Sequence, residues 1–468
     1  MESFDLIVIG SGSGTHVASM ASNAGWRVAL IDHGPAGGTC LNNGCIPSKM
    51  LIHPADVVRV IQESAAIGVN ARIERLDFEE IMERMRSTVK GSRESLERAL
   101  ESTPGLSFYR DRAEFVGDYL LKAGGRTLTA GSIVIATGAR PSFPPIRGLE
   151  EAGYLDNISL LDLKEPPESL IVIGGGYIGC EYGHFFSAIG TDVTIIGRAG
   201  RILSDEDPEV SSIVQMALSR HMRVITGHDV VAVRREDGGK VVSARSSDDG
   251  QVHEFEAEEI LLAAGRRSNS DLLRPERTGV MTDAHGWILV DEYLETTKRD
   301  ILAIGDAIGR HMFRHTANHE AEVVSHNLLR AKSRHEWIKA DFHAVPHAVF
   351  THPQVAAVGM NESEALALGM KVLVGRARYT DVARGHAMAE DGLVKVLVEE
   401  GTGRILGAAA VGSSASELIQ QITYLMNTEH QDIQPILHSQ VIHPAIDEVV
   451  AHAISLLEPS ERGARKER

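Results

Sequence analysis

Two stretches of the chain repeat one pattern of apolar and polar positions: a short apolar run, a glycine-rich turn, a helical segment and a second apolar run. The apolar runs are residues 6–9, 28–32, 170–173 and 193–196, and the helical segments end near Gly25 and Ile189. Short buried runs on either side of a helix predict a βαβ unit, and the strand-to-helix turn of such a unit can hold a pyrophosphate. Two copies therefore predict two dinucleotide sites.

The second unit is expected to be inserted in something larger. Proline-rich segments at 141–145 and 166–167 suggest its boundaries, and 236–239 and 248–250 are typical of hairpin turns within it. Beyond it, residues 300–306 predict a buried strand and 316–331 a helix. Further on, the alternating runs 372–374, 394–398 and 405–411 predict an antiparallel sheet closed by helices, and the charged tail 458–468 is expected to fray. The fold class is thus α/β, with two Rossmann-like domains and a C-terminal α+β domain.

Composition limits the classes of partner. A chain of 468 residues with 43% apolar side chains can build two to four packed domains. Its 64 acidic and 47 basic side chains give a net charge of −17, which repels nucleic acids and anionic membranes. The sequence has no long uncharged apolar run, and its first residues carry Glu2 and Asp5 where a leader would be basic, so we expect a cytoplasmic location.

The first glycine turn departs from the usual dinucleotide pattern at one position. Gly10 and Gly12 meet the needs of the bend and of the close approach to a pyrophosphate, but the third position, which should be small, is Thr15. Gly14 beside it can relieve the crowding. Asp32, at the end of the next strand, can accept hydrogen bonds from an adenosine ribose. The competing interpretation of one such turn is a tight bend that binds nothing.

The second turn is complete, with glycines at 174, 176 and 179. The strand that follows ends without the carboxylate that would bind a free 2′-hydroxyl, and Arg198 and Arg201 lie just beyond it. Guanidinium groups at this place favour a 2′-phosphate and hence NADP(H) over NAD(H). The alternative is that both arginines are solvated surface charges.

Three cysteines are too few for a disulfide scaffold, so the close pair Cys40 and Cys45 indicates chemistry. Five residues of regular helix advance about 7.5 Å and turn about 500°, whereas a disulfide needs Cα atoms roughly 4.4 to 6.8 Å apart. The helix must therefore distort, and Gly44 supplies the freedom. A disulfide made under this constraint is easily reduced, and a cysteine near a helix N-terminus favours the thiolate form. Cys180 is expected to be a small buried residue.

With these residues the chain resembles the class I flavoprotein disulfide reductases, the family of dihydrolipoamide dehydrogenase, glutathione reductase and mycothione reductase. The resemblance extends over nearly all of the chain. Its motifs are residues 37–49 around the cysteines, 136–141 after a strand, 264–267, 304–306 and 443–448. It implies an FAD-binding domain in two parts, residues 1–147 and 271–342, an NAD(P)-binding domain at 148–270 and a dimerisation domain at 343–468.

The resemblance also implies residue roles. Cys40 would exchange with the substrate, and Cys45 would contact the flavin. Lys49 would lie near the flavin and pair with Glu181. Asp306 would bind the FAD ribityl chain. Besides the two glycine turns with Asp32, Arg198 and Arg201, the cofactor-binding residues implied are Gly38, Thr39, Thr137, Gly138, Tyr177 as a lid over the nicotinamide, Gly265 and Gly305.

His443 and Glu448 form a candidate acid–base dyad. A dithiol mechanism needs a base for one thiol and an acid for the departing one, and imidazole titrates in the required range. Glu448, five residues later, can fix the tautomer through the other ring nitrogen. A lone histidine is more often structural. In the family the dyad comes from the partner subunit, which implies a homodimer.

The sequence is compatible with two classes of disulfide substrate. The segment Cys-Ile-Pro-Ser-Lys favours a dihydrolipoamide dehydrogenase-like enzyme acting on a small or lipoyl-type disulfide. Residues 317–321, the ending from His443 and the missing ribose carboxylate favour instead a mycothione reductase-like enzyme that uses NADPH. No cysteine follows Cys180, which argues against mercuric reductase. A flavoprotein docking subunit with an idle dithiol is a further alternative. His315 and His319 have one-turn spacing, but no further ligand completes a metal site.

Overall fold

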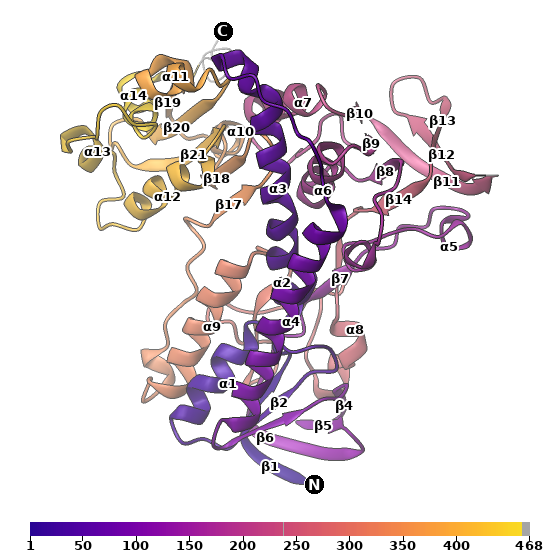
Figure 1. Ribbon diagram of the computed structural model, residues 1–468. Coiled ribbons are helices and arrows are strands. Elements are labelled where there is room, and N and C mark those ends of the chain that lie inside the picture. The colour runs from indigo at the N-terminus through magenta and orange to yellow at the C-terminus, as the bar shows by residue number, and fades with distance from the viewer. Residues whose placement is uncertain (237, 461–468) are drawn as a thin grey trace. The chain divides into compact units, whose positions relative to one another are not determined.

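The computed structural model describes residues 1–236 and 238–460, and the chain forms two compact units (Figure 1). Unit 1 comprises residues 1–50, 80–143 and 265–341. Unit 2 comprises residues 51–79, 144–264 and 342–468, of which 461–468 lie outside the described residues. Because the chain leaves unit 1 and returns to it, the second βαβ unit is an insertion, as the sequence predicted. The division into four domains stays a prediction.

Unit 1 is built on a seven-stranded sheet in the order β3-β2-β1-β6-β5-β4, with β16 also paired to β6. The pairs among β3, β2, β1, β6 and β16 are parallel, and β5 and β4 continue the sheet in antiparallel fashion. All four residues of β2 and all three of β16 are buried, as expected of parallel strands covered on both faces. The strands are β1 (Glu2–Ile9), β2 (Val28–Ile31), β3 (Leu106–Tyr109), β4 (Glu114–Gly117), β5 (Leu120–Ala123), β6 (Arg126–Ile135) and β16 (Ile301–Ala303).

Two helices of unit 1 place its candidate residues. Helix α1 (Gly14–Asn23) follows β1, and α9 (Arg314–Leu329) packs beside it although some 300 residues separate the two (Figure 1). A short antiparallel ribbon of β7 (Ala139–Pro141) and β15 (Arg266–Ser268) contacts the turn after β16, and α9 also packs on this turn. Segments distant in sequence therefore meet around the carboxyl ends of the parallel strands, where α/β folds bind ligands.

Four helices join or cover these strands. The cysteine segment forms the short α2 (Gly38–Asn42) and the start of α3 (Cys45–Glu63), which continues into unit 2. Helix α4 (Phe78–Ser102) leads back from unit 2 into unit 1, and α8 (Ser270–Leu273) follows β15.

Unit 2 contains the second βαβ unit, a four-stranded parallel sheet in the order β10-β9-β8-β14. Its apolar strands are buried, which fits the continuous apolar runs in the sequence. Its elements are β8 (Ser169–Ile173), α6 (Tyr177–Ala188), β9 (Asp192–Ile196), α7 (Pro208–Leu218), β10 (Arg223–Ile225) and β14 (Glu259–Leu262), preceded by α5 (Leu149–Ala152).

The predicted hairpins form a three-stranded antiparallel sheet of β11 (His228–Glu236), β12 (Gly239–Ser246) and β13 (Val252–Ala257). The first hairpin turn includes Asp237, which lies outside the described residues.

The C-terminal part of unit 2 is a six-stranded sheet in the order β17-β18-β21-β20-β19-β22, whose pairs are antiparallel (Figure 1). Its core packs α12 and α14 against the sheet. The tail, expected to fray, begins as strand β22, and residues 461–468 lie outside the described residues. The elements are β17 (Pro346–Val349), β18 (Val355–Gly359), α10 (Glu362–Ala367), β19 (Val372–Arg378), α11 (Ala383–Met388), β20 (Leu393–Glu399), β21 (Ile405–Val411), α12 (Ala415–Met426), α13 (Gln434–His438), α14 (Glu448–Ser455) and β22 (Glu458–Pro459).

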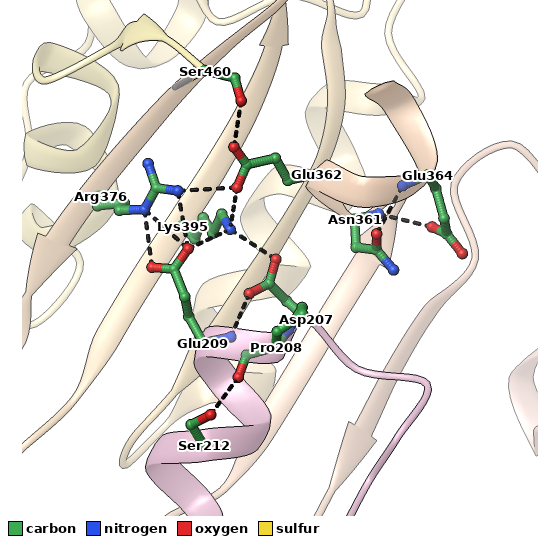
Figure 2. A network of polar contacts seen from close by, with 10 residues as sticks. All are labelled: Asp207, Pro208, Glu209, Ser212, Asn361, Glu362, Glu364, Arg376, Lys395 and Ser460. Atoms are coloured by element: carbon green, nitrogen blue, oxygen red, sulfur yellow. Dashed lines mark hydrogen bonds and ion pairs between the residues drawn. The ribbon is translucent and has the colours of Figure 1, made fainter. Parts of the chain in front are cut away.

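A buried lysine on the six-stranded C-terminal sheet forms ion pairs with residues at the start of α7, the helix that follows β9 in the second βαβ unit (Figure 2). Lys395 on β20 is fully buried, and its Nζ lies 2.8 Å from a carboxylate oxygen of each of Asp207, Glu209 and Glu362. Arg376 adds a second cation, 2.9 Å from Glu209 and 3.0 Å from Glu362. Three carboxylates thus face two cations, and each buried charge depends on the others for compensation.

Removing this lysine should expose that dependence. Lys395→Met leaves three carboxylates without their central partner, so we expect a loss of about 3–5 kcal/mol in the free energy of unfolding. Lys371→Met, at an exposed lysine before β19, is the matched control and should change little.

The loss should also depend on pH. Burial alone would raise the pKa of Glu209, but Arg376 and Lys395 outweigh it and lower this pKa to about 2. The pKa of Glu362 is lowered as well. This stability is present above the ordinary glutamate pKa and disappears as pH falls. Urea unfolding should therefore show a smaller deficit for Lys395→Met near pH 4 than near pH 7, and an equal deficit at both pH values would contradict the electrostatic account.

Candidate functional site

The turn between β1 and α1 requires two glycines for steric reasons. Gly10 has φ +109°, and a Cβ there would lie 2.1 Å from a backbone carbonyl oxygen. A Cβ on Gly14 would lie 2.8 Å from the Val8 side chain. Gly14 therefore supplies the close helix–strand packing that the motif assigns to the next position. Thr15 fits in that position because its hydroxyl donates to the Ser11 carbonyl oxygen at 2.6 Å.

The other predicted residues of the first nucleotide site gather beside this turn. A Cβ on Gly38 would lie 2.8 Å from the Cα of Gly12, so the backbone of α2 passes close to the turn. Asp32 Oδ2 accepts from the Ser11 amide and hydroxyl at 2.7 and 2.6 Å, and Oδ1 accepts from the Gly34 amide at 2.9 Å. These bonds fix the carboxylate at the end of β2, where an adenosine ribose would meet it.

A second group of polar residues surrounds the turn after β16. Asp306 Oδ2 lies 3.4 Å from an Arg266 nitrogen. Burial raises the pKa of Asp306, and Arg266 opposes this shift. Three buried atoms, Thr137 Oγ1, Arg266 Nε and Glu320 Oε1, have no hydrogen-bond partner among the described residues. Unused donors and acceptors in a buried place are expected where a polar ligand completes the structure.

The second glycine turn, in unit 2, also requires glycines for steric reasons. A Cβ on Gly174 would lie 2.2 Å from the Ala263 carbonyl oxygen, and one on Gly179 would lie 2.1 Å from the Gly174 oxygen. At Gly176, the residue before α6, no described atom lies within 4 Å of the corresponding position. The start of α6 therefore has room for an anionic group beside its backbone amides.

The arginines after β9 differ in their surroundings. Arg198 is exposed, and Arg201 donates to the Ser204 carbonyl oxygen at 2.8 Å. In the part of the chain that the structure describes, neither arginine forms an ion pair with a carboxylate. Binding of a 2′-phosphate by these residues stays a prediction.

The two cysteines lie on either side of a break in the helix. Cys40 belongs to α2, and Cys45 is the first residue of α3. The break falls at Asn43, with φ −151° and ψ 26°. Gly44 is needed because a Cβ would lie 2.9 Å from the Thr39 carbonyl oxygen. The predicted distortion is present, but Gly44 provides space and Asn43 provides the change of direction.

The two thiols are chemically unequal. The Cys40 S–H donates to Cys45, and this hydrogen bond is the main cause of a pKa lowered to about 7 at Cys45, where burial opposes the shift and Lys49 and then Arg314 support it. The same bond, with burial, raises the pKa of Cys40. The lowered pKa favours the thiolate at Cys45, and the raised pKa favours the protonated thiol at Cys40.

Arg314 was missed by the sequence analysis. It is the exposed first residue of α9, more than 260 positions beyond the cysteines, and its charge reaches both sulfurs. A cation at a helix N-terminus opposes the helix dipole. This unfavourable placement was the available signal of a function in the sequence.

The structure brings His443 and Glu448 into contact, and their acid–base role stays a prediction. His443 Nδ1 lies 2.8 Å from Glu448 Oε1, and the Ala445 amide donates to Glu448 Oε2 at 3.1 Å. The hydrogen bond to His443 is the main cause of a lowered pKa at Glu448. The imidazole is 70% exposed, so its other nitrogen is accessible to a reactant.

Two further predicted residues lie on α6. Tyr177 is its first residue, and Glu181, one turn later, is buried. Glu181 Oε1 accepts from the Phe350 amide at 3.0 Å, which holds the carboxylate in place. Pairing of Glu181 with Lys49 stays a prediction.

Comparison with known families agrees with this geometry. A model of the pyridine nucleotide-disulphide oxidoreductases matches residues 4–321, and a model of the dimerisation domain of the same family matches residues 345–454. The chain belongs to the pyridine nucleotide-disulphide oxidoreductase family. Enzymes of this family use FAD and NAD(P)H.

Relatives of this oxidoreductase have different named substrates. It is 36% identical to mycothione reductase of Mycobacterium tuberculosis over 97% of this chain and 99% of the relative. It is 32% identical to dihydrolipoyl dehydrogenase of Chlamydia muridarum, covering 97% of each chain. Among solved structures, the HOCl-induced flavoprotein disulfide reductase RclA of Escherichia coli has a TM-score of 0.85 at 28% identity, covering 97% of this chain and 100% of that chain.

The residues of unit 1 fit FAD. The glycine turn at Gly10 and Gly12 opens toward a helix N-terminus, and the buried, unsatisfied Thr137 Oγ1 and Arg266 Nε can take polar groups of the cofactor. In the described residues no group of three or more metal-ligating side chains could hold a metal ion, and His315 instead stacks on Phe313. None of the described helices is long and apolar enough to cross a membrane.

The charge at Cys45 should depend on Arg314 and Lys49. Arg314→Ala and Lys49→Met should each raise the pKa of Cys45, by roughly one unit, because each removes a cation near the thiolate. The rate of iodoacetamide alkylation of the reduced protein against pH measures this pKa, with peptide mapping to assign the cysteine. Arg112→Ala, an exposed arginine of unit 1, is the control. Unchanged titration in both variants would remove these cations from the account.

Proposed function

We propose that this oxidoreductase reduces a disulfide of low molecular weight with electrons from NADPH, through FAD and the Cys40–Cys45 pair. The placement of the two thiols carries the proposal, because Cys45 is the first residue of α3, where a thiolate is favoured and its pKa is lowered, whereas the pKa of Cys40 is raised. When bound, FAD would accept a hydride from the nicotinamide and pass two electrons to a disulfide.

The thiol steps follow from this inequality. Deprotonated Cys40 attacks one sulfur of the substrate, a mixed disulfide forms, and the first product thiolate leaves. Cys45 thiolate then attacks the Cys40 sulfur, the Cys40–Cys45 disulfide forms, and the second product leaves. Two electrons have then moved from the pair to the substrate, and NADPH restores the dithiol.

His443 supplies the proton transfers in this proposal. It accepts the Cys40 proton and returns it to the first product thiolate, while Glu448 holds the imidazole in the required tautomer. The matched dimerisation domain contains both residues. We infer a homodimer in which each His443 serves the dithiol of the partner chain.

The nicotinamide and substrate classes are chosen on separate grounds. No carboxylate lies at positions 197–204 directly after β9, and Arg198 is exposed there, which supports NADPH. The sequence favoured a dihydrolipoamide dehydrogenase-like enzyme. The identity to mycothione reductase, 36%, is higher than that to dihydrolipoyl dehydrogenase, 32%, and together with the features that favour NADPH it supports a small disulfide substrate. A lipoyl-type substrate is the second candidate, supported by the segment from Cys45 to Lys49.

Steady-state turnover distinguishes these functions. The wild-type protein should oxidise NADPH faster than NADH and reduce small disulfides such as mycothione faster than it oxidises dihydrolipoamide. Arg198→Ala should weaken the binding of NADPH by about 1.5–3 kcal/mol, the scale of one charged hydrogen bond, and leave the binding of NADH almost unchanged. Tenfold better use of NADH by the wild type would refute the cofactor assignment. A flavoprotein with no turnover on any disulfide would favour a docking subunit.

Mixed dimers test the shared site. His443→Ala should slow the dithiol–disulfide half-reaction by about 10²–10⁴ and leave reduction of the flavin by NADPH nearly normal, because only thiol exchange needs the acid–base group. Reassorted dimers of Cys40→Ser and His443→Ala subunits contain one site with both defects and one with neither. Their activity should rise well above that of either parent. Confirmed hybrids as inactive as the parents would exclude a site shared between subunits.

A further inference from the structure

Glu320 is a buried carboxyl group with one oxygen unused. The residue is 1% exposed on α9. Its Oε2 accepts from the Gly305 amide at 2.5 Å, and its Oε1 has no hydrogen-bond partner among the described residues. In the same part of the chain, no lysine, arginine or histidine forms an ion pair with it. An ionised carboxylate is costly in such a place, whereas a neutral carboxylic acid is not.

The surrounding charges also favour the neutral form. Burial is the main cause of a pKa raised to about 7 at Glu320, Asp306 adds to it, and the Gly305 amide and Arg310 oppose it. Arg266 on β15 pairs with Asp306. On the side of α1, His16 is paired with Glu322 at 2.9 Å. No cation is therefore committed to Glu320 itself.

We propose that Glu320 carries a proton in the folded protein, and that this proton allows the Gly305–Asp306 turn to hold FAD. Glu320 is a positioning residue, because it acts through the Gly305 amide and through the charge of Asp306. The inference rests on the proposed binding of the FAD ribityl chain at Asp306. It adds a titrating group that neither the motifs nor the comparisons assign.

The charge balance of the turn gives the mechanism. With Glu320 neutral, Asp306 presents one negative charge opposite Arg266 and can accept hydrogen bonds from ribityl hydroxyls. Ionised Glu320 places a second negative charge beside Asp306 in a buried region, which favours protonation of Asp306 or opening of the turn. Either change weakens the grip on FAD.

The direction of the pH dependence follows from the raised pKa. An unfolded glutamate titrates near 4.5, and folded Glu320 near 7, so the folded protein binds the extra proton between these values. The stabilising effect is fully present below the lower value and is lost as pH rises through the higher one. Raising the pH should therefore release FAD, and a glutamine, which cannot ionise, should prevent this release.

The experiment measures the dissociation constant of FAD by its fluorescence, from about pH 5.5 to about pH 8.5. For wild-type protein we expect the constant to rise by up to about tenfold per pH unit above pH 7, because the fraction of protonated Glu320 falls by that factor. Glu320→Gln should bind as tightly as the wild type at low pH and show no such rise. Glu322→Gln, two residues later and exposed, is the matched control and should follow the wild type.

The same rise in Glu320→Gln as in the wild type would overturn the proposal. Failure of the wild type to bind FAD at any pH would instead refute the proposed function, so the two failures are distinguishable. A second measurement covers poor folding of the glutamine variant. As the pH rises from about 6 to about 10, the infrared difference spectrum of wild-type holoprotein should lose the carbonyl band of a neutral carboxylic acid. Because FAD binds the protonated form, the midpoint should lie above pH 7, and it should move in Glu320→Asp. A spectrum without that band would contradict the proposal equally.

Discussion

Two thiols that share one proton impose the main constraint on this protein. Cys40 can donate to Cys45 only because the helix breaks between them at Asn43, and the break needs Gly44 to pass close to Thr39. The contact lowers the pKa of Cys45 and raises that of Cys40, which favours charge on Cys45 and a need for a base at Cys40. The cations near Cys45 and an acid–base dyad in the dimerisation domain are what such a pair requires.

The same principle governs charges far from the dithiol. Lys395 is stable in the interior because three carboxylates surround it, and Arg376 limits their mutual repulsion. Glu320 has no such cation, so neutralisation by a proton is the cheaper solution. Lys395 is therefore neutralised by ion pairs, whereas a proton would neutralise Glu320, and these two solutions respond to pH in opposite directions.

Local patterns were enough to predict the two βαβ units, the helix distortion between Cys40 and Cys45 and the His443–Glu448 contact, because each is set by spacing within a short segment. The role of Gly14 was visible only in part, since its crowding by Val8 depends on strand geometry. Arg314, Glu320 and the Lys395 network were missed because their effects depend on tertiary contacts. Arg314 lies more than 260 positions beyond the cysteines, and the burial of Glu320 and Lys395 is decided by packing that no periodicity reports.

Trapping the mixed disulfide tests the central claim most directly. The account predicts that reduced Cys45→Ser protein, given a small disulfide substrate, accumulates a covalent adduct on Cys40, because the second thiol that would release it is absent. Peptide mass mapping locates the adduct. Cys40→Ser protein should form little adduct on Cys45. A Cys45 adduct formed as fast as the Cys40 adduct would contradict the division of roles between the two thiols.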